Sequence, residues 1–262
     1  MCDIVNEKVK NMKIGIISDV HSNIDALKKV FKRFNDEKVD KVICIGDVIG
    51  IGSYPEECIQ FLMNNKNMLL SFVRGNHENY LLNGIKRKNH TEKEAKPMTD
   101  EQIATHIWNH SRLDKEEREF IKTLKNKDCI EIEGKIVVIE HYQMDEKNKF
   151  KRFIKNPTCK EIKELFEEKN ADIYLFGHTH QIYYLENNGK YYINPGSLGC
   201  PINSNGAHAG ILEINNEKIE YKQLEIEYNI EKVINDIQQL NYPLYDFMIN
   251  EFYINEKMQN KN

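Results

Sequence analysis

Two histidines separated by a single threonine are the feature of this sequence most suited to chemistry. In YLFGHTHQIYY (174–184), His178 and His180 come directly after an apolar run that ends in glycine. Taken alone, such a pair is as consistent with an ordinary polar turn as with two metal ligands. Its meaning depends on which side chains stand at the ends of the other apolar runs of the chain.

Four other short apolar runs also end in side chains that can bind a metal ion. These side chains, found in SDVHSN, GDVIGIG, GNHE and KIVVIEHYQ, are Asp19, His21, Asp47, Asn76, His77 and His141. Ligands bind at the carboxyl ends of the strands in open α/β sheets, so we expect these side chains to converge. Mixed oxygen and nitrogen donors suit Mn, Fe or Zn. The sequence therefore predicts a metal site built from five strand ends.

The elements that must position these residues begin with alternating strands and helices. Strands are predicted at 13–18, 41–46 and 68–75, with helices at 23–37 and 55–65 between them. This order indicates a parallel core sheet. From 80 to 127 the pattern predicts a helical insertion that includes a capped helix at 99–110. In that insertion, the charged KEERE run at 115–119 is interpreted as a solvated helix face.

The second half of the chain is richer in strands. Strands are predicted at 129–133, 135–140 and 172–177, a helix at 159–170, and hairpins turning at Asn188-Gly189 and Asn215-Asn216. Helices should close the chain within 229–262. We therefore expect an α/β fold of the α+β sandwich type, in which helices flank two packed mixed β-sheets. A single domain should span 1–262, with 1–11 as a loose extension.

Composition limits the classes of function. Of the 262 residues, 40% are hydrophobic and 30% charged, which is typical of a folded globular protein. The net charge of -4 and the scattered basic residues argue against a general nucleic-acid surface. No apolar run suits a membrane span or an export signal, and the six cysteines form no CxxC pair. These features predict a cytoplasmic protein with reduced thiols; they leave the oligomeric state open.

The order of these segments resembles a known family. DxH, GD, GNH[DE], H and GHxH, together with NPGSLG, are similar to the calcineurin-like metallophosphoesterase superfamily and its small bacterial phosphodiesterase branch. The resemblance covers roughly residues 13 to 200. It implies two divalent metal ions, with manganese favoured over iron, zinc or nickel. It also implies hydrolysis of a small phosphodiester, with a nucleotide as one candidate, by a hydroxide that bridges the two ions.

The resemblance also implies a role for each residue. The first ion would be held by Asp19, His21, Asp47 and His180. The second would be held by Asp47, Asn76, His141 and His178. His77 is not a ligand in the family pattern, and an ordinary near-neutral pKa would let it protonate or hydrogen-bond the leaving oxygen.

Some features depart from this pattern or leave alternatives open. Tyr142 and Gln143 come after His141 where family members often have small residues, which puts the local pocket shape in question. A phosphomonoesterase or a hydrolase of a nucleotide's pyrophosphate linkage would use the same two ions. A protein-binding scaffold of the same fold is a different class of function, although this chain keeps every ligand and His77.

Three other features have a structural interpretation. NPGSLG (194–199) is interpreted as a turn between sheets or a substrate contact, and Arg74 as a surface ion pair rather than a phosphate ligand. The remaining histidines have no assigned role. They are His90, His106, His110 and His208.

Overall fold

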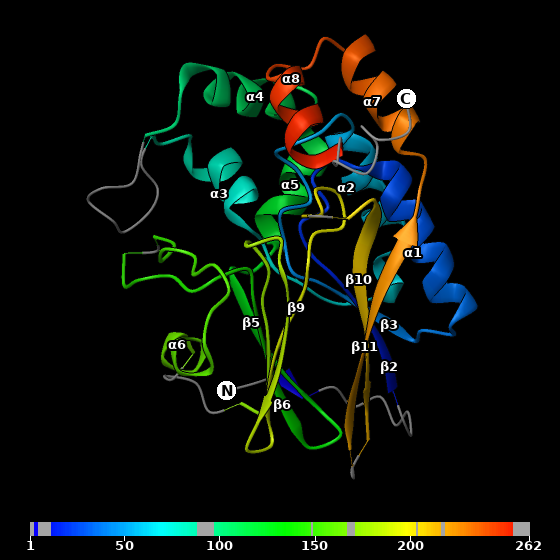
Figure 1. Ribbon diagram of the computed structural model, residues 1–262, viewed down its shortest axis with the longest axis vertical. Coiled ribbons are helices and arrows are strands. Elements are labelled where there is room, and N and C mark those ends of the chain that lie inside the picture. The colour runs from blue at the N-terminus through cyan, green and yellow to red at the C-terminus, as the bar shows by residue number, and fades with distance from the viewer. Residues whose placement is uncertain are drawn as a thin grey trace.

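The structure is a computed structural model that describes residues 3–4, 12–87, 97–147, 149–166, 171–202, 204–215 and 218–253. Two β-sheets pack face to face with helices around them (Figure 1). The predicted sandwich of two mixed sheets flanked by helices is thus confirmed. That 1–262 form one domain stays a prediction.

The five-stranded sheet carries the predicted parallel core. Its strand order is β11 (Ile219–Glu227), β10 (Gly206–Ile214), β2 (Met12–Ile17), β3 (Lys41–Cys44) and β4 (Leu69–Phe72). The strands β2, β3 and β4 run parallel, whereas β10 lies antiparallel to β2 and places Gly210 opposite Ile16. The first and the late segments of the chain are therefore neighbours at the centre of this sheet.

The six-stranded sheet is also mixed. Its order is β1 (Asp3–Ile4), β5 (Lys127–Ile132), β6 (Lys135–Glu140), β7 (Ile173–Leu175), β9 (Lys190–Pro195) and β8 (Ile182–Asn187). The predicted turn at Asn188-Gly189 joins β8 to β9, and both residues have the positive φ that a two-residue hairpin loop of type I′ requires. The second predicted hairpin joins β10 to β11, but Asn216 lies outside the described residues.

Apolar side chains fill the space between the sheets. Ile14 and Ile16 of β2 alternate with residues that face the helices, and they pack with Ile139, Leu175 and their neighbours from the other sheet. This alternation results from the period of two in a strand. The sheets are thereby held so that their loops meet at one end of the sandwich.

Helices cover the outer faces of both sheets. α1 (Ile24–Asp36) and α2 (Pro55–Asn64) pack on the five-stranded sheet, and α6 (Cys159–Leu165) packs on the other. The α1 helix begins at Asn23, whose side chain accepts a hydrogen bond from the N–H of Ala26. The remaining short element on this side is a 3₁₀ turn, η1 (Lys66–Met68).

A second group of helices lies above the ends of the strands (Figure 1). It comprises α3 (Asn76–Asn83), α4 (Asp100–His110), α5 (Lys115–Thr123), α7 (Ile230–Gln239), α8 (Tyr245–Met248) and a π-helical turn, η2 (Ile249–Tyr253). Trp108 of α4 packs against Tyr242, with ring centroids 4.9 Å apart. The segment predicted as an insertion and the C-terminal helices are thus in contact.

Three predictions need correction or a limit. Glu117 is buried on α5 and accepts a hydrogen bond from Gln60, so the KEERE run is not entirely a solvated face. Cys129 is disulfide-bonded, which contradicts the prediction that all six cysteines are reduced. In the predicted loose extension, Asp3–Ile4 pairs with β5, and the other residues of 1–11 lie outside the described part. None of the helices in the described ranges is long and apolar enough to cross a membrane.

Candidate metal centre

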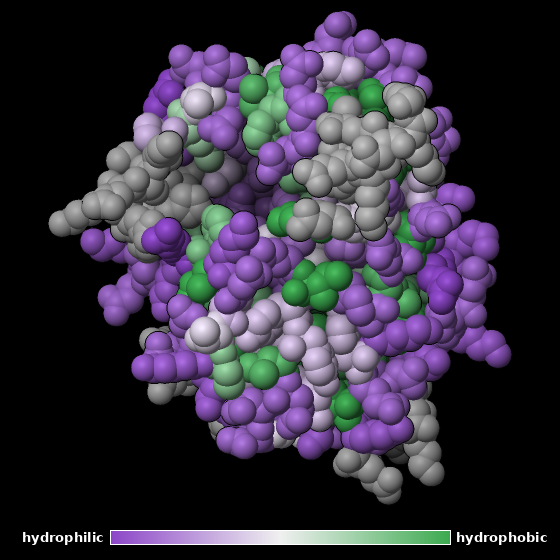
Figure 2. Space-filling view, viewed as in Figure 1, coloured by the Kyte–Doolittle hydropathy of each residue, from purple (hydrophilic) through white to green (hydrophobic). Residues whose placement is uncertain are grey.

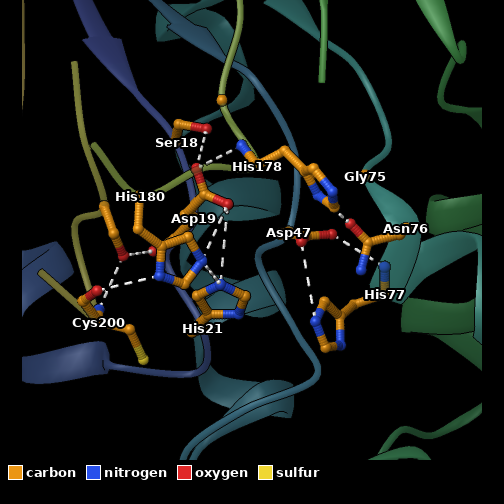
Figure 3. A network of polar contacts seen from close by, with 12 residues as sticks. Ser18, Asp19, His21, Asp47, Gly75, Asn76, His77, His178, His180 and Cys200 are labelled. Atoms are coloured by element: carbon orange, nitrogen blue, oxygen red, sulfur yellow. Dashed lines mark hydrogen bonds and ion pairs between the residues drawn. The ribbon is translucent and has the colours of Figure 1, made fainter. Parts of the chain in front are cut away.

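Five loops bring the predicted ligands together at one end of the sandwich. They come after β2, β3, β4, β6 and β7, and each begins within a few residues of its strand end. Figure 3 shows side chains from four of these loops pointing toward one another. The convergence expected from the parallel strand ends is therefore present in the structure.

One cluster surrounds Asp19. Its Oδ1 lies 3.7 Å from Nε2 of His21 and 3.5 Å from Nε2 of His180. The same two histidine nitrogens are 2.9 Å apart. The other carboxylate oxygen accepts hydrogen bonds from Ser18 Oγ and the N–H of His178. The hydrogen bonds to Oδ2 thus orient the Asp19 side chain, and its Oδ1 faces the two imidazole rings.

A second cluster surrounds Asp47. Its Oδ2 lies 3.0 Å from Nε2 of His141, and its Oδ1 accepts a hydrogen bond from the N–H of His77. Beside it, Nδ1 of His178 lies 2.8 Å from Oδ1 of Asn76. The two clusters adjoin, since Nε2 of His141 is also 3.8 Å from the Asp19 carboxylate.

The histidine rings are oriented by backbone carbonyls on their far side. Nδ1 of His141 lies 2.7 Å from the carbonyl oxygen of Ile45, and Nδ1 of His180 lies 3.0 Å from that of Cys200. A ring that donates from Nδ1 presents the lone pair of Nε2 inward. This outer hydrogen bond is the one that fixes the tautomer of metal-ligating histidines.

Several buried donor atoms at the centre lack a hydrogen-bond partner among the described residues. They are Oδ1 of Asp19, Nδ1 of His21 and Nδ1 of His77. Unpaired buried polar atoms are costly, so several of them at one place indicate a missing binding partner.

Three sets of side chains in the described ranges could hold a metal ion, each with ligand atoms within 4.8 Å of one another. They are Asp19, His21 and His180; His21, Asp47 and His77; and Asp47, His141 and His178. The donor set fits divalent metal ions.

The electrostatics of the centre result from burial and close charges. Burial alone would lower the pKa of His141, but the carboxylates of Asp47 and Asp19 raise it to about 9. Burial raises the pKa of Asp19. Burial would also raise the pKa of Asp47, but His141 and His77 hold it well below its usual range. The carboxylates of Asp19 and Asp47 therefore stabilise positive charge at the centre, as the raised pKa of His141 indicates.

Burial lowers the pKa of His77 to about 3, although Asp47 opposes that shift. The ring is therefore neutral near pH 7. This corrects the expectation of an ordinary near-neutral pKa. His77 can still hydrogen-bond an oxygen next to the centre, because a neutral imidazole keeps one N–H donor.

Backbone strain is concentrated in these loops. Positive φ angles occur at Asp19, His21, Asp47, His178 and His180. Non-glycine residues adopt this region at a cost and mostly where the surrounding structure imposes it. Gly75 is required for another reason, since a Cβ there would lie 2.1 Å from Oδ1 of Asp47. The backbone of these loops is therefore held in costly conformations that direct the side chains toward the centre.

Glu78, from the GNHE segment, is the main anchor of the Asp47 loop. Its fully buried carboxylate accepts hydrogen bonds from the N–H groups of Asp47, Val48, Ile49 and Gly75, at 2.7 to 3.2 Å. Burial and the neighbouring Asp47 raise its pKa to about 7. Glu78 ties the loop after β3 to the start of α3.

Two residues of α4 at this site had no role in the sequence analysis. Asn109 accepts a hydrogen bond from the N–H of Gly50 and donates to Ser22 Oγ and the carbonyl of Gly52. The ring of His106 lies 5.0 Å from that of His77. The helical spacing of the two residues, three apart, places them on one face of α4. Their position against the metal-site loops had no signal in the sequence.

The other histidines lie away from the centre or outside the described residues. His110 neighbours His106 on α4, with ring centroids 6.1 Å apart, and His208 is buried in β10. His90 is the one outside the described ranges. None of these three is among the ligand sets of the described part of the chain.

NPGSLG and Arg74 have structural partners. Ser197 is fully buried, donates to the carbonyl of Asp19 and accepts from the N–H of Cys200, which favours the structural interpretation of this turn. Arg74 donates from Nε to the amide oxygen of Asn126. No ion pair of Arg74 is found within the described ranges, so the surface pair stays a prediction.

The family model of the calcineurin-like phosphoesterase superfamily domain matches residues 12–217, and the chain belongs to this superfamily. It is 30% identical over 259 residues to the uncharacterized protein MJ0912 of Methanocaldococcus jannaschii, which covers 90% of this chain and 95% of that protein. It is 24% identical over 217 residues to phosphodiesterase MJ0936 of the same organism, which covers 82% of this chain and all (100%) of that protein.

The fold is also similar to a solved structure. The crystal structure of a metallophosphoesterase from Sphaerobacter thermophilus superposes with a TM-score of 0.69 at 22% identity, over 92% of this chain and 98% of that one. The resemblance indicated by the sequence motifs is therefore confirmed at the level of the superfamily and the fold.

Proposed function

We propose that the protein is a binuclear metal-dependent phosphodiesterase. The observation that supports this most strongly is the position of Asp47. Its carboxylate belongs both to the ligand set with His141 and His178 and to the set with His21 and His77. A carboxylate shared between two sets of ligands is what a pair of neighbouring ions requires.

In this proposal each ion has three ligands of its own and shares Asp47 with the other. One ion is held by Asp19, His21, Asp47 and His180. The other is held by Asp47, Asn76, His141 and His178. Two divalent ions bound there would activate water and neutralise charge on the phosphoryl group. Manganese is favoured, with iron, zinc or nickel as alternatives.

The protein's own residues position the reaction. Glu78 and Asn109 hold the loop that carries Asp47, which fixes the distance between the two ligand sets. His77 donates a hydrogen bond from its neutral ring to the leaving oxygen. Burial of the centre excludes bulk water and strengthens these electrostatic interactions.

Two hollows beside the centre favour a diester over a monoester. One, of about 220 Å³, is lined by Asn76 and His77. The other, of about 500 Å³, is lined by Phe150, whose ring stacks on His178, and by Arg74. Tyr80 lines both. A diester has two organic groups to place, whereas a monoester has one.

The larger hollow is suited to an anionic substrate. Its lining includes Arg74, Lys86, Lys147 and Lys149, and it contains no acidic residue within the described ranges. A nucleotide is one candidate of this kind. The 24% identical relative is described as a phosphodiesterase, which agrees with this assignment.

Phosphomonoester or pyrophosphate-linkage hydrolysis remains the enzymatic alternative, because the same ions would serve it. A non-catalytic scaffold is the alternative of another class. Against it stand His77 and the donors Asp19, His21, Asp47, Asn76 and His141, which are all buried although a protein-binding surface would not need to bury them.

The test is hydrolysis after metal exchange. The protein is freed of metal with a chelator, restored with Mn, and assayed with bis(p-nitrophenyl) phosphate and p-nitrophenyl phosphate. We expect preference for the diester and a loss of at least about 1,000-fold in Asp47→Asn. Greater turnover of the monoester would favour the phosphatase alternative. No turnover with Mn, Fe, Ni or Zn, together with unchanged metal content in Asp47→Asn, would contradict the proposal.

A further inference from the structure

The hollow beside His77 is lined largely by residues of α4, α8 and the segments next to them, which lie outside the metal-binding loops. Its walls come from α4, from α8 and from the segment that precedes α8, with Tyr80 of α3 between them. Apolar surface gathers where α4 and α8 approach one another (Figure 2). Most of the lining residues are neither proposed metal ligands nor part of the two sheets, which indicates a further function for the hollow.

The position of the hollow indicates which part of a substrate it would meet. Asn76 and His77 line it, whereas Asp19, His141 and His180 do not. In the proposed reaction, His77 hydrogen-bonds the leaving oxygen. A group attached to that oxygen would therefore extend past His77 into this hollow.

The lining is suited to a ring. Tyr80, Tyr242 and Phe247 contribute aromatic side chains, and Met248 contributes a polarisable thioether. The volume of about 220 Å³ exceeds the roughly 150 Å³ in which a buried benzene molecule fits. One substituted ring, or two fused rings, would fill it.

One polar group gives the hollow a point of recognition. His106 lines it, and its Nδ1 is buried with no hydrogen-bond partner in the described part of the chain. Its ring contacts both His77 and Tyr80, with centroids 5.0 Å away in each case. A heteroatom on a bound ring would supply the partner that Nδ1 lacks.

We propose that this hollow binds an aromatic or heteroaromatic ring on the leaving group of the phosphodiester, with His106 contacting a ring heteroatom. This inference rests on the proposed function, because it uses the metal centre to place the phosphoryl group. It adds the chemical class of the alcohol that is released.

The experiment measures binding, so that the contribution of the hollow is determined independently of catalytic turnover. Benzylphosphonate and methylphosphonate carry the same metal-binding group, and only the first carries a ring. Calorimetry with the Mn-loaded full chain should show benzylphosphonate binding at least about tenfold more tightly. Phe247→Ala should reduce this preference about two- to tenfold, because it removes one aromatic wall.

Ile107→Ala is the matched control. Ile107 lies on α4 next to His106, is 58% exposed and does not line the hollow. It should leave the preference unchanged. Phe247 is itself 50% exposed, so its replacement should leave the fold intact and remove only its contact with a bound ring.

The outcomes separate the two proposals. Equal affinity for both phosphonates overturns the ring-binding hollow while leaving the metal centre intact. Binding of neither phosphonate in the presence of Mn contradicts the proposed function, and the hollow's assignment with it. A ring preference that survives undiminished in Phe247→Ala would place the ring elsewhere and overturn this inference.

Discussion

The Glu78 carboxylate is the group on which the Asp47 loop depends most directly. Glu78→Gln replaces one acceptor oxygen by an NH₂ group that would face backbone N–H donors. We expect Mn affinity and kcat to fall about 10- to 100-fold, as is usual when the support of a metal ligand is removed. Equilibrium dialysis with Mn and steady-state kinetics would measure both.

Glu117→Gln is the comparison for this change. Glu117 is also a buried acid, but it accepts its hydrogen bond from Gln60 on α2, away from the metal-site loops. Its replacement should alter stability more than Mn affinity. Equal losses in the two variants would mean that Glu78 acts through general stability rather than through Asp47.

His106 should make stability depend on pH. Burial lowers its pKa to about 4, below the value of about 6.5 for an unfolded chain. The unfolded state therefore binds more protons between these values, and stability falls as pH decreases through about 6.5. From about pH 7.5 to about pH 5.5, His106 should contribute about 1 kcal/mol of this loss.

The measurement compares urea unfolding of the metal-free wild type and His106→Phe at the two pH values. All other titrating groups are shared, so the difference in slope isolates His106. An identical pH dependence in both proteins would contradict a lowered pKa of His106 in the folded state.

At the scale of elements, the turn through Gly50 should control His77. Gly50 has a φ of +106°, and a Cβ there would lie 1.8 Å from Nδ1 of His77. We expect Gly50→Ala to lower kcat at least about tenfold because the ring must move. Gly189→Ala is the control, since it has φ of +75° but no atom within 4 Å of the added Cβ. Gly189→Ala should lose about 1 kcal/mol of stability from backbone strain alone. Gly50→Ala should lose more because of the added clash, and only this variant should lose activity.

The strand ends and their ligands could be predicted from the sequence because each depends on a short pattern. Asp19, Asp47 and His178 come after apolar runs whose length identifies them as strands, and parallel strands end at one edge of a sheet. Local turn chemistry likewise predicts the hairpin at Asn188-Gly189. In these cases the information lies within a few residues of the feature.

The helical side of the site could not be predicted in the same way. Asn109 and His106 lie on an amphipathic helix whose pattern shows which face is buried but not what it is buried against. The lowered pKa of His77 depends on burial by that helix, so the sequence does not predict it. Arg74 hydrogen-bonds Asn126, a partner that the sequence pattern does not indicate. These properties depend on packing between distant segments.

At the scale of the whole molecule, metal binding should be linked to stability. The centre buries Asp19, Asp47 and His141 at one place, and bound cations would satisfy donors that are otherwise unpaired. At Mn concentrations of about 100 times Kd, one bound ion adds about 2.7 kcal/mol. For a chain of this length we expect Tm to rise by about 5–10 °C.

Differential scanning calorimetry with and without chelator would measure this rise. Asp47→Asn should show at most half of it, because the shared ligand is altered. A Tm that does not respond to Mn, Fe, Ni or Zn would contradict the presence of a metal centre.

The pairing of β10 with β2 has a consequence for how the protein is made. Gly210 and Ile16 are neighbours in the sheet although their positions in the sequence differ by 194. One edge of β2 therefore remains open until β10 has left the ribosome, and closing so long a loop is slow. During synthesis this edge is the place where the nascent chain is most exposed to wrong strand pairing, and where a chaperone would have most to protect.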